Sequence, residues 1–559
     1  MRSTLLTLFR KVEVPAYLFF IFIYPFLFIS FGLDFGDSPY HYLTYAGFRP
    51  VSSYTFLSTV LGNGWMRIVG DSYISYRILA VMLTLVAHII PVLVLIGSDF
   101  NLKEKLRYLA LGIVFSSAIS FNLLNYDIFS WLILSFIFVT GYLYVQKSKS
   151  WLIFILGVCL AIITAIRLPS IVVIIPILII IIANETKNNS GILKTGLKIA
   201  ILIVTAGVFY YLLRFIFYHN HTVTQIAKHS GDTLTLWEFL KEKTYYVIKL
   251  FPRYLSNGIV IFEMIGVILL ITFIWNKFRL ITSKIWIHYL FLISFLFAYF
   301  LFYVLRSNYN FNLSLFYSAL TLFFIFNLLF IAIELKKSNL ILILCFTAMI
   351  GFVAAIGSNT GLLKMAGVNT FVLPVILLLT IKSIPTRLKG GFYVLMSLLF
   401  FFSVTNKILV GKTYEDGRIL QLNSAVDQMK LKGIKTSDDR KIQIEEILAT
   451  IDSVRQTDAK SKFVFYGTTS HLFAYLSDSP QLVQLPFSMV FNDSLKAKAL
   501  GHIISEGDLK PFVLLVFNYP EIDANMDAGL IGQQLESRSY SMFKSGNNYQ
   551  FYGYKLKQN

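Results

Sequence analysis

Long apolar runs alternate with short polar connections along most of the chain. A run of about 17 to 25 apolar residues is the length that an α-helix needs to cross a bilayer. About thirteen such runs begin near residues 15, 73, 108, 128, 151, 169, 199, 259, 285, 313, 340, 368 and 390. The first run follows Arg2, Arg10 and Lys11 and has no small-residue cleavage site behind it. It therefore predicts a retained first helix, with the N-terminus in the cytoplasm.

Basic residues gather in every second connection between the apolar runs. The positive-inside rule assigns such connections to the cytoplasm, and an odd number of spans then places the C-terminal part of the chain outside. The predicted cytoplasmic connections hold Lys103, Lys105 and Arg107; Lys147 and Lys149; Lys187, Lys194 and Lys198; Lys277, Arg279 and Lys284; Lys336 and Lys337; and Lys382, Arg387 and Lys389.

Three segments on the predicted outer side are longer than a minimal connection: residues 33–72, residues 218–258 and the tail from about residue 411. Long loops often carry function. Residues 33–72 predict two short helices along the membrane interface, the first with Ser38 as N-cap and Pro39 as its first helical residue.

The composition turns polar from Thr413. Strand-like segments at 462–467, 481–485 and 511–518 alternate with charged helical stretches, and a last strand follows the turn signal Gly546-Asn547. The pattern predicts an all-α polytopic membrane domain over residues 1–410 and an α/β domain outside the membrane over residues 411–559.

Composition and charge agree with a membrane protein. The 559 residues are 56% hydrophobic and only 14% charged, which excludes an ordinary soluble protein. The formal net charge of +19 does not indicate nucleic-acid binding, because the basic residues lie in short clusters beside apolar runs. Both cysteines, Cys159 and Cys345, lie inside apolar runs, so neither a disulfide framework nor a thiolate metal site is predicted.

Two carboxylates follow the first apolar run directly. Asp34 and Asp37 in FGLDFGDSPYHYL could act as a general base or as ligands of a hard divalent cation such as Mg²⁺ or Mn²⁺. Acids at this place also commonly cap the next helix. Two acids without a third ligand leave catalysis without a metal equally open. No metal-ligating residues are predicted elsewhere, since a single histidine such as His41 does not make a site.

This segment resembles the acidic motif after the first helix of the GT-C membrane glycosyltransferases. The branch concerned contains the protein O-mannosyltransferases and the lipid A aminoarabinose transferases. Asp37 matches the catalytic acid of that motif, and Ser38 stands where the family often has a second acid. The resemblance leaves open whether Asp34 supplies the missing carboxylate.

Three further segments are similar to the family in order and loop side. They are VGDSYISYRILAVML with Arg77, LNYDIFSW with Asp127, and AIRLPSIVVIIP with Arg167. The resemblance covers roughly residues 1–210, and the later spans match in topology only. It implies a GT-C-like fold and inverting transfer from a polyprenyl-phosphate-linked sugar.

The predicted site combines these residues. Asp37, with Asp34, is the catalytic candidate. The predicted ligands of the donor phosphate are Arg77, Arg167 and Arg306. The predicted substrate-binding residues are Tyr40, His41, Asp127, Asn308, Asn359 and Lys364. Other readings remain, since Arg167 could reach the interface simply to solvate its charge, Tyr40 fits an interfacial aromatic belt, and Arg306 and Lys364 lie among ordinary turn-forming residues.

The sequence thus predicts a glycosyltransferase at the outer face of a membrane, with the bacterial inner membrane favoured and the C-terminal domain in the periplasm. Its partners would be a polyprenyl-phosphate-linked sugar, the lipid bilayer, and a lipid, glycan or protein acceptor. The alternatives are a transporter or flippase of lipid-linked oligosaccharides, a protein of the O-antigen ligase or polymerase type centred on residues 218–258, and a structural membrane protein.

Overall fold

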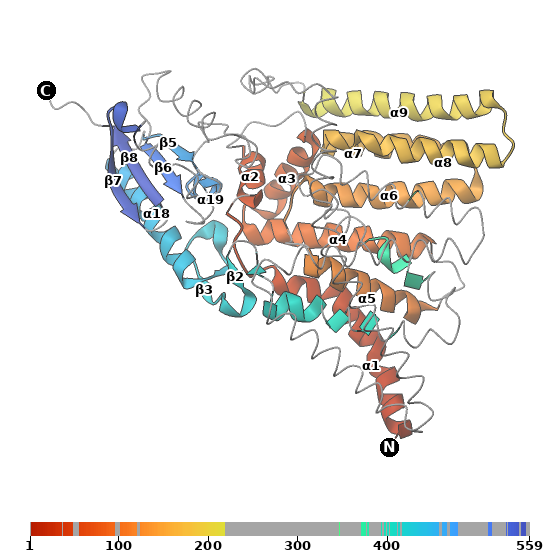
Figure 1. Ribbon diagram of the computed structural model, residues 1–559, viewed down its shortest axis with the longest axis horizontal. Coiled ribbons are helices and arrows are strands. Elements are labelled where there is room, and N and C mark those ends of the chain that lie inside the picture. The colour runs from red at the N-terminus through yellow and green to blue at the C-terminus, as the bar shows by residue number, and fades with distance from the viewer. Residues whose placement is uncertain are drawn as a thin grey trace.

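A block of apolar helices and a smaller strand-containing region make up the described part of the chain (Figure 1). The structure is a computed structural model. It describes residues 2–35, 37–47, 55–95, 101–119, 123–218, 416–457, 461–466, 470–478, 512–516, 535–546 and 549–554, with short pieces between 346 and 413 and residue 533.

The first seven predicted spans are helical. They correspond to α1 (Arg2–Phe22), α4 (Tyr73–Leu95), α5 (Leu102–Ile119), α6 (Tyr126–Lys147), α7 (Ser150–Ile166), α8 (Ile174–Lys187) and α9 (Ile192–Tyr218). Within the described residues, four helices are long and apolar enough to cross a membrane: 73–94, 126–147, 168–187 and 192–218. The spans predicted from residues 259, 285 and 313 lie outside the described residues, and the total count stays a prediction.

Local signals at the helix termini explain where the helices begin and end. Asn125 caps α6, because its side chain accepts hydrogen bonds from the backbone N–H groups of Asp127 and Ile128. α7 ends before Arg167, whose backbone is extended, and Pro169 opens the short 3₁₀-helix η2 (Leu168–Val173). α9 lies at the edge of the block and exposes most of its apolar side chains, as a lipid-facing helix would (Figure 1).

Two short helices fill the connection between α1 and α4, as predicted: α2 (Asp37–Tyr45) and α3 (Phe56–Val69). They follow a 3₁₀-helix, η1 (Tyr24–Phe28), that ends the first span. α2 packs through aromatic rings, since Tyr42 stacks on Tyr76 of α4 with centroids 4.1 Å apart. The short helices therefore lie on one end of the apolar block.

The C-terminal region contains helices and a sheet, which confirms the mixed α/β character. Its four-stranded sheet has the order β5-β6-β8-β7, with β5 parallel to β6 and the other neighbours antiparallel. The predicted segment 481–485 lies outside the described residues. The sheet strands and two of the helices of the region are β5 (Phe463–Tyr466), β6 (Phe512–Val516), β7 (Tyr540–Gly546), β8 (Tyr549–Tyr554), α18 (Asp438–Thr457) and α19 (Ser470–Leu476).

Shorter elements connect this region to the helical block. They are the π-helix η3 (Asn406–Val410), the 3₁₀-helices η4 (Ile419–Gln421) and η5 (Met429–Leu431), and the two-residue strands β1 (Lys412–Thr413), β2 (Gly417–Arg418), β3 (Ser424–Ala425) and β4 (Lys435–Thr436). Lys435 pairs with the chain just after α1, since its N–H donates to Ser30 O at 2.7 Å and its carbonyl accepts from Gly32 N at 2.8 Å.

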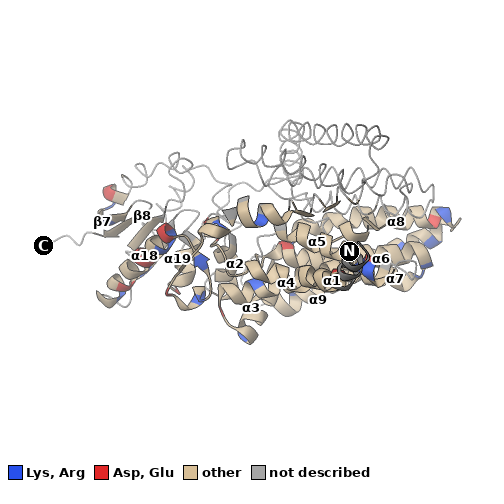
Figure 2. Ribbon diagram, turned by 90° about the horizontal axis from the view of Figure 1, so that it is seen from below, with Lys and Arg blue, Asp and Glu red and all other residues tan. Residues whose placement is uncertain are grey.

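We call the end of the block that contacts the C-terminal region the proximal end, and the opposite end the distal end. α2, α3 and α19 lie at the proximal end (Figure 1). The distal end holds the first residues of α5 and the last residues of α6 and α8. Charged residues are visible at the far ends of α7 and α8 and over α18 and α19 (Figure 2). The division of the chain at residue 410 stays a prediction.

Candidate functional site

Aromatic and imidazole rings from three elements meet at the proximal end. His41 of α2 lies with its ring centroid 5.2 Å from that of Tyr126, at the start of α6. Tyr40 contacts His41 at 5.2 Å and His471 of α19 at 5.5 Å. Both histidines are buried. The chain thus brings together residues that are hundreds of positions apart, including one from the C-terminal region.

An arginine and a carboxylate lie beside these rings. Arg167 Nη1 is 3.7 Å from Asp127 Oδ1, an ion-pair distance longer than a direct hydrogen bond. The Arg167 guanidinium lies over the Tyr126 ring, 5.5 Å from its centroid. The helix break at Pro169 places Arg167 here, and Asp127 lies in the first turn of α6, where the helix dipole favours an anion. The sequence named both residues but did not predict that they pair.

Little space is open around this pair. A cavity of about 10 Å³ is lined by Asp127, Arg167, Ser130 and Ser170, together with apolar residues of α6 and α7. That volume suits about one water molecule. Both charged side chains are largely buried, with 8% exposed for Arg167 and 15% for Asp127. A larger substrate would reach the pair only if the surrounding elements separated.

The two acids after α1 occupy different positions. Asp34 is buried, and its Oδ2 accepts a hydrogen bond from Ser38 N at 2.5 Å, so its carboxylate caps α2. Tyr73 Oη donates to the Asp34 carbonyl at 2.9 Å. Asp37 is the first residue of α2, one turn before His41. The Asp37 side chain lies outside the described part of the structure.

Arg77 lies beneath the acidic segment. It is fully buried, and its guanidinium donates to the carbonyls of Ile29 at 2.8 Å, Phe31 at 3.2 Å and Gly32 at 2.6 Å. These carbonyls follow η1, so the cation stabilises the turn that leads to Asp34. That Arg77 binds the donor phosphate stays a prediction. Its hydrogen bonds to these three carbonyls also fit a positioning role.

Residues of the C-terminal region also contact the turn that leads to Asp34. Asp416 Oδ2 accepts a hydrogen bond from Leu33 N at 3.0 Å and also contacts the Thr436 hydroxyl. Gly32 adopts a φ of +77°, and a Cβ there would lie 2.6 Å from the Thr413 side chain. Only glycine fits such a close approach with positive φ. The backbone just before Asp34 is therefore fixed by both regions.

A second polar cluster joins the two regions, and the sequence analysis missed it. Asp71, just before α4, accepts hydrogen bonds at Oδ1 from Tyr475 Oη at 2.6 Å and Tyr76 Oη at 2.9 Å. Lys430 Nζ lies 3.2 Å from Asp71 Oδ2 and 2.5 Å from Asp478 Oδ1. Burial, with the nearby Asp71 carboxylate, raises the pKa of Tyr475 well above its usual value. We call these residues the α19 clamp.

Four predicted site residues cannot be placed. Arg306, Asn308, Asn359 and Lys364 lie outside the described residues. Among the residues that are described, no group of three or more histidine, cysteine, aspartate or glutamate side chains could hold a metal ion.

Comparison with known proteins gives distant similarities to solved structures only. No family model and no curated protein matches the chain. One solved structure that it resembles is the crystal structure of ArnT from Cupriavidus metallidurans bound to undecaprenyl phosphate. The sequence identity is 10%, the TM-score is 0.37, and the match covers 99% of each chain. This likeness is too distant to assign an activity.

Proposed function

We propose that this chain is an inverting glycosyltransferase that takes its sugar from a polyprenyl-phosphate donor at the outer face of a membrane. One observation carries the proposal. The acidic segment, His41 and the Asp127–Arg167 pair, which lie far apart in the sequence, converge at one end of an apolar helical block. In this proposal the proximal end is the outer end.

The site suits an amphiphilic donor. A polyprenyl tail would stay in the bilayer while its phosphate lies at the interface, level with the helix break at Arg167. An arginine is costly beside a bilayer unless it is paired or faces a polar cavity. Asp127 lies 3.7 Å away and lines the same small polar cavity as Arg167. In the proposal, Arg167 contacts the donor phosphate when the site opens.

The chemistry needs a base and a stabilised leaving group. An acceptor hydroxyl would attack the anomeric carbon of the sugar, opposite the phosphate, which inverts that centre. The new bond joins the acceptor oxygen to this carbon, the carbon–oxygen bond to the phosphate breaks, and polyprenyl phosphate leaves. Asp37 would take the hydroxyl proton, and Arg167 would stabilise the charge on the phosphate.

The neighbouring residues would position this machinery. Asp34 caps α2 and Arg77 stabilises the turn before it, so both hold Asp37 at the start of its helix. Tyr40 and His41 lie beside Tyr126 and would contact the sugar or the acceptor. His471 brings the C-terminal region to the same place, which suits a role in acceptor binding. Arg306, Asn308, Asn359 and Lys364 remain proposed substrate contacts. The proposal uses no metal ion.

The test is sugar transfer in membranes that contain the full chain. A panel of radiolabelled polyprenyl-phosphate sugars is offered to wild type, Asp37→Asn and the matched control Asp439→Asn, an exposed residue of α18. Loss of a general base predicts a rate reduction of about 100-fold or more in Asp37→Asn only. Each reaction is run with and without a chelator, and loss of activity with the chelator would show that the site needs a metal ion.

Three results would contradict the proposal. Transfer at the wild-type rate by well-expressed Asp37→Asn would overturn the assignment of the base. Movement of the intact donor across the membrane without cleavage would indicate the transporter or flippase alternative. Consumption of no donor by well-expressed wild type, with a total lipid and cell-wall extract as acceptor, would overturn the donor class.

A further inference from the structure

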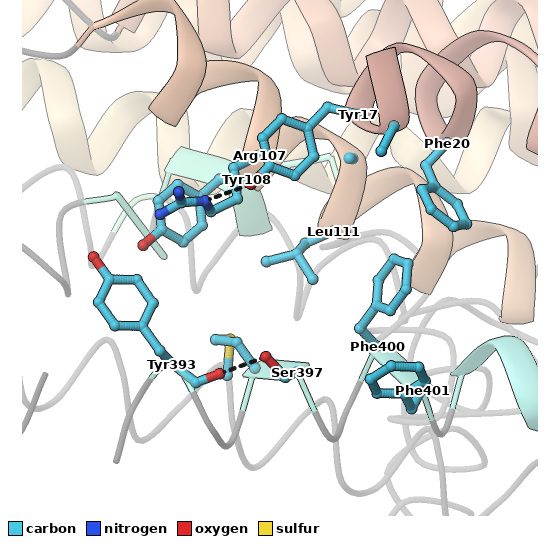
Figure 3. A pocket seen from close by; sticks show the side chains of 12 residues that line it. Tyr17, Phe20, Arg107, Tyr108, Leu111, Tyr393, Ser397, Phe400 and Phe401 are labelled. Carbon is cyan, nitrogen blue, oxygen red and sulfur yellow. Dashed lines mark hydrogen bonds between the residues drawn. The ribbon is translucent and has the colours of Figure 1, made fainter. Parts of the chain in front are cut away.

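A larger cleft lies away from the proposed site, toward the distal end. It has a volume of about 490 Å³, within the range of ligand sites. α1 and α5 form one side, and residues from the segment before η3 form the other (Figure 3). Its lining includes Tyr17, Phe20, Arg107, Leu111, Ser397 and Phe400.

The lining of this cleft is apolar along most of its length. Phe20 and Phe400 meet edge to face with centroids 4.8 Å apart, and Leu111 lies near them (Figure 3). Met396 also lines the cleft. Phe401 is 60% exposed. In a membrane, exposed apolar side chains of this kind face lipid. The cleft therefore opens to the bilayer.

One part of the cleft carries positive charge. Arg107 lies in the second turn of α5, roughly 8 Å along the helix from its first residue at 1.5 Å per residue. Its Nε donates to Tyr17 Oη at 2.8 Å, and its Nη2 donates to Glu13 Oε1 at 2.6 Å. The described residues give Nη1 no hydrogen-bond partner. Figure 3 places the guanidinium beside Tyr108 on the cleft wall.

The charge balance of this cluster favours an anion. Glu13 is shared by two cations, Arg107 and Lys103. Basic clefts between membrane helices at the cytoplasmic side are typical sites for anionic lipid head groups. The predicted topology places this end of α5 in the cytoplasm.

We propose that the cleft binds an anionic phospholipid of the inner leaflet. Its phosphate contacts Arg107 Nη1, and one acyl chain lies along Phe20, Leu111 and Phe400. A free phosphate would not account for the long apolar part, and an uncharged lipid would not account for Arg107. This inference concerns the opposite end of the block and does not depend on the proposed transferase activity.

The experiment uses photolabelling of the full-length protein in phosphatidylcholine vesicles. Two probes carry the same diazirine-bearing acyl chain, one on phosphatidylglycerol and one on phosphatidylcholine. Labelled peptides are then mapped by mass spectrometry. One arginine near a membrane surface contributes enough to predict about fivefold more label from phosphatidylglycerol on the peptides that contain Leu111 and Phe400. Arg107→Gln should reduce this label to the phosphatidylcholine level.

Two variants separate the cleft from general surface charge. Lys147→Gln removes an exposed lysine from the last turn of α6 at the same end and should leave the label on the cleft peptides unchanged. Ser397→Trp fills the cleft at an exposed residue without changing charge, and should remove the acyl-chain label of both probes. The melting temperature of each variant checks that it is folded.

The proposal is overturned if folded wild type takes up both probes equally on the cleft peptides. It is also overturned if Arg107→Gln keeps the preference for phosphatidylglycerol, or if label spreads evenly over all peptides at the distal end. Competition by soluble glycerol phosphate at the lipid's own concentration would show a free-phosphate site instead.

Discussion

Each end of the helical block combines an arginine, a carboxylate and a tyrosine, but in different surroundings. At the proximal end, Arg167 pairs with Asp127 at 3.7 Å and lies over the Tyr126 ring. Toward the distal end, Arg107 pairs with Glu13 at 2.6 Å, and Tyr17 accepts a hydrogen bond from it. The proximal pair lines a cavity of about 10 Å³, whereas the distal arginine lines a cleft of about 490 Å³.

This difference shows that enclosure, more than residue type, sets what an arginine can do. The distal pair is partly exposed, with 29% for Arg107 and 23% for Glu13, and its short hydrogen bond anchors the cation without covering it. The proximal pair is enclosed by residues of α6, α7 and η2. A buried cation interacts more strongly with an anionic partner than an exposed one does, because little water competes for it.

The largest expected effect is a loss of stability at the proximal end. Arg77→Ala removes a buried cation from three backbone carbonyls, and breaking such a buried charged group costs about 3 kcal/mol or more. We expect a much lower melting temperature in detergent and cleavage of residues 33–72 by added protease. Arg67→Ala, at an exposed residue of α3, is the control. Equal stability of the two variants would show that Arg77 does not support the acidic segment.

The second-largest expected effect is on the rate of sugar transfer. It tests whether Arg167 is a ligand of the donor phosphate or a structural residue. Arg167→Gln should reduce transfer about 100-fold, the usual loss when one group that stabilises developing charge is removed. Asp127→Asn should cost less, about tenfold, because Asp127 acts by orienting Arg167. The double variant should be no slower than Arg167→Gln. A lower kcat with an unchanged KM for the acceptor would support the assignment, and additive effects of the two changes would contradict it.

A smaller effect concerns the α19 clamp, which joins the proximal end to the C-terminal region. Lys430→Gln leaves Asp71 and Asp478 without their shared cation, and we expect about tenfold faster proteolysis of the C-terminal region, equivalent to about 1.4 kcal/mol. Lys432→Gln, at an exposed neighbour, should change nothing. If both variants were cleaved at the wild-type rate, the clamp would not hold the two regions together.

The sequence predicted what depends on local pattern. The first seven helices follow from runs of apolar residues, and the break at Arg167 follows from Pro169. The strands 463–466 and 512–516 and the last hairpin also follow from local signals. The sequence left open whether Asp34 takes part in the chemistry or caps the next helix. The hydrogen bond that it accepts from Ser38 N is the contact of a helix cap.

Contacts between distant parts of the chain were not predicted. The bond from Tyr475 to Asp71 joins residues 404 positions apart, and that from Leu33 to Asp416 joins residues 383 positions apart. The spacing of apolar residues along the chain does not indicate which distant residues will be in contact. Arg77 illustrates a second limit, because a motif names an arginine but cannot tell whether it will bind a phosphate or backbone carbonyls.

The smallest effect tests whether the distal cleft acts through one arginine or through diffuse charge. Lys103 shares Glu13 with Arg107 but is itself 36% exposed, and exposed ion pairs contribute only about 0 to 1 kcal/mol. Lys103→Gln should therefore reduce phosphatidylglycerol labelling of the cleft by about twofold at most, against about fivefold for Arg107→Gln. Equal losses in the two variants would mean that the lipid responds to the summed charge at this end and not to the geometry of the cleft. A small loss for Lys103 with a full loss for Arg107 would place the phosphate on the guanidinium, because only that group lines the cleft.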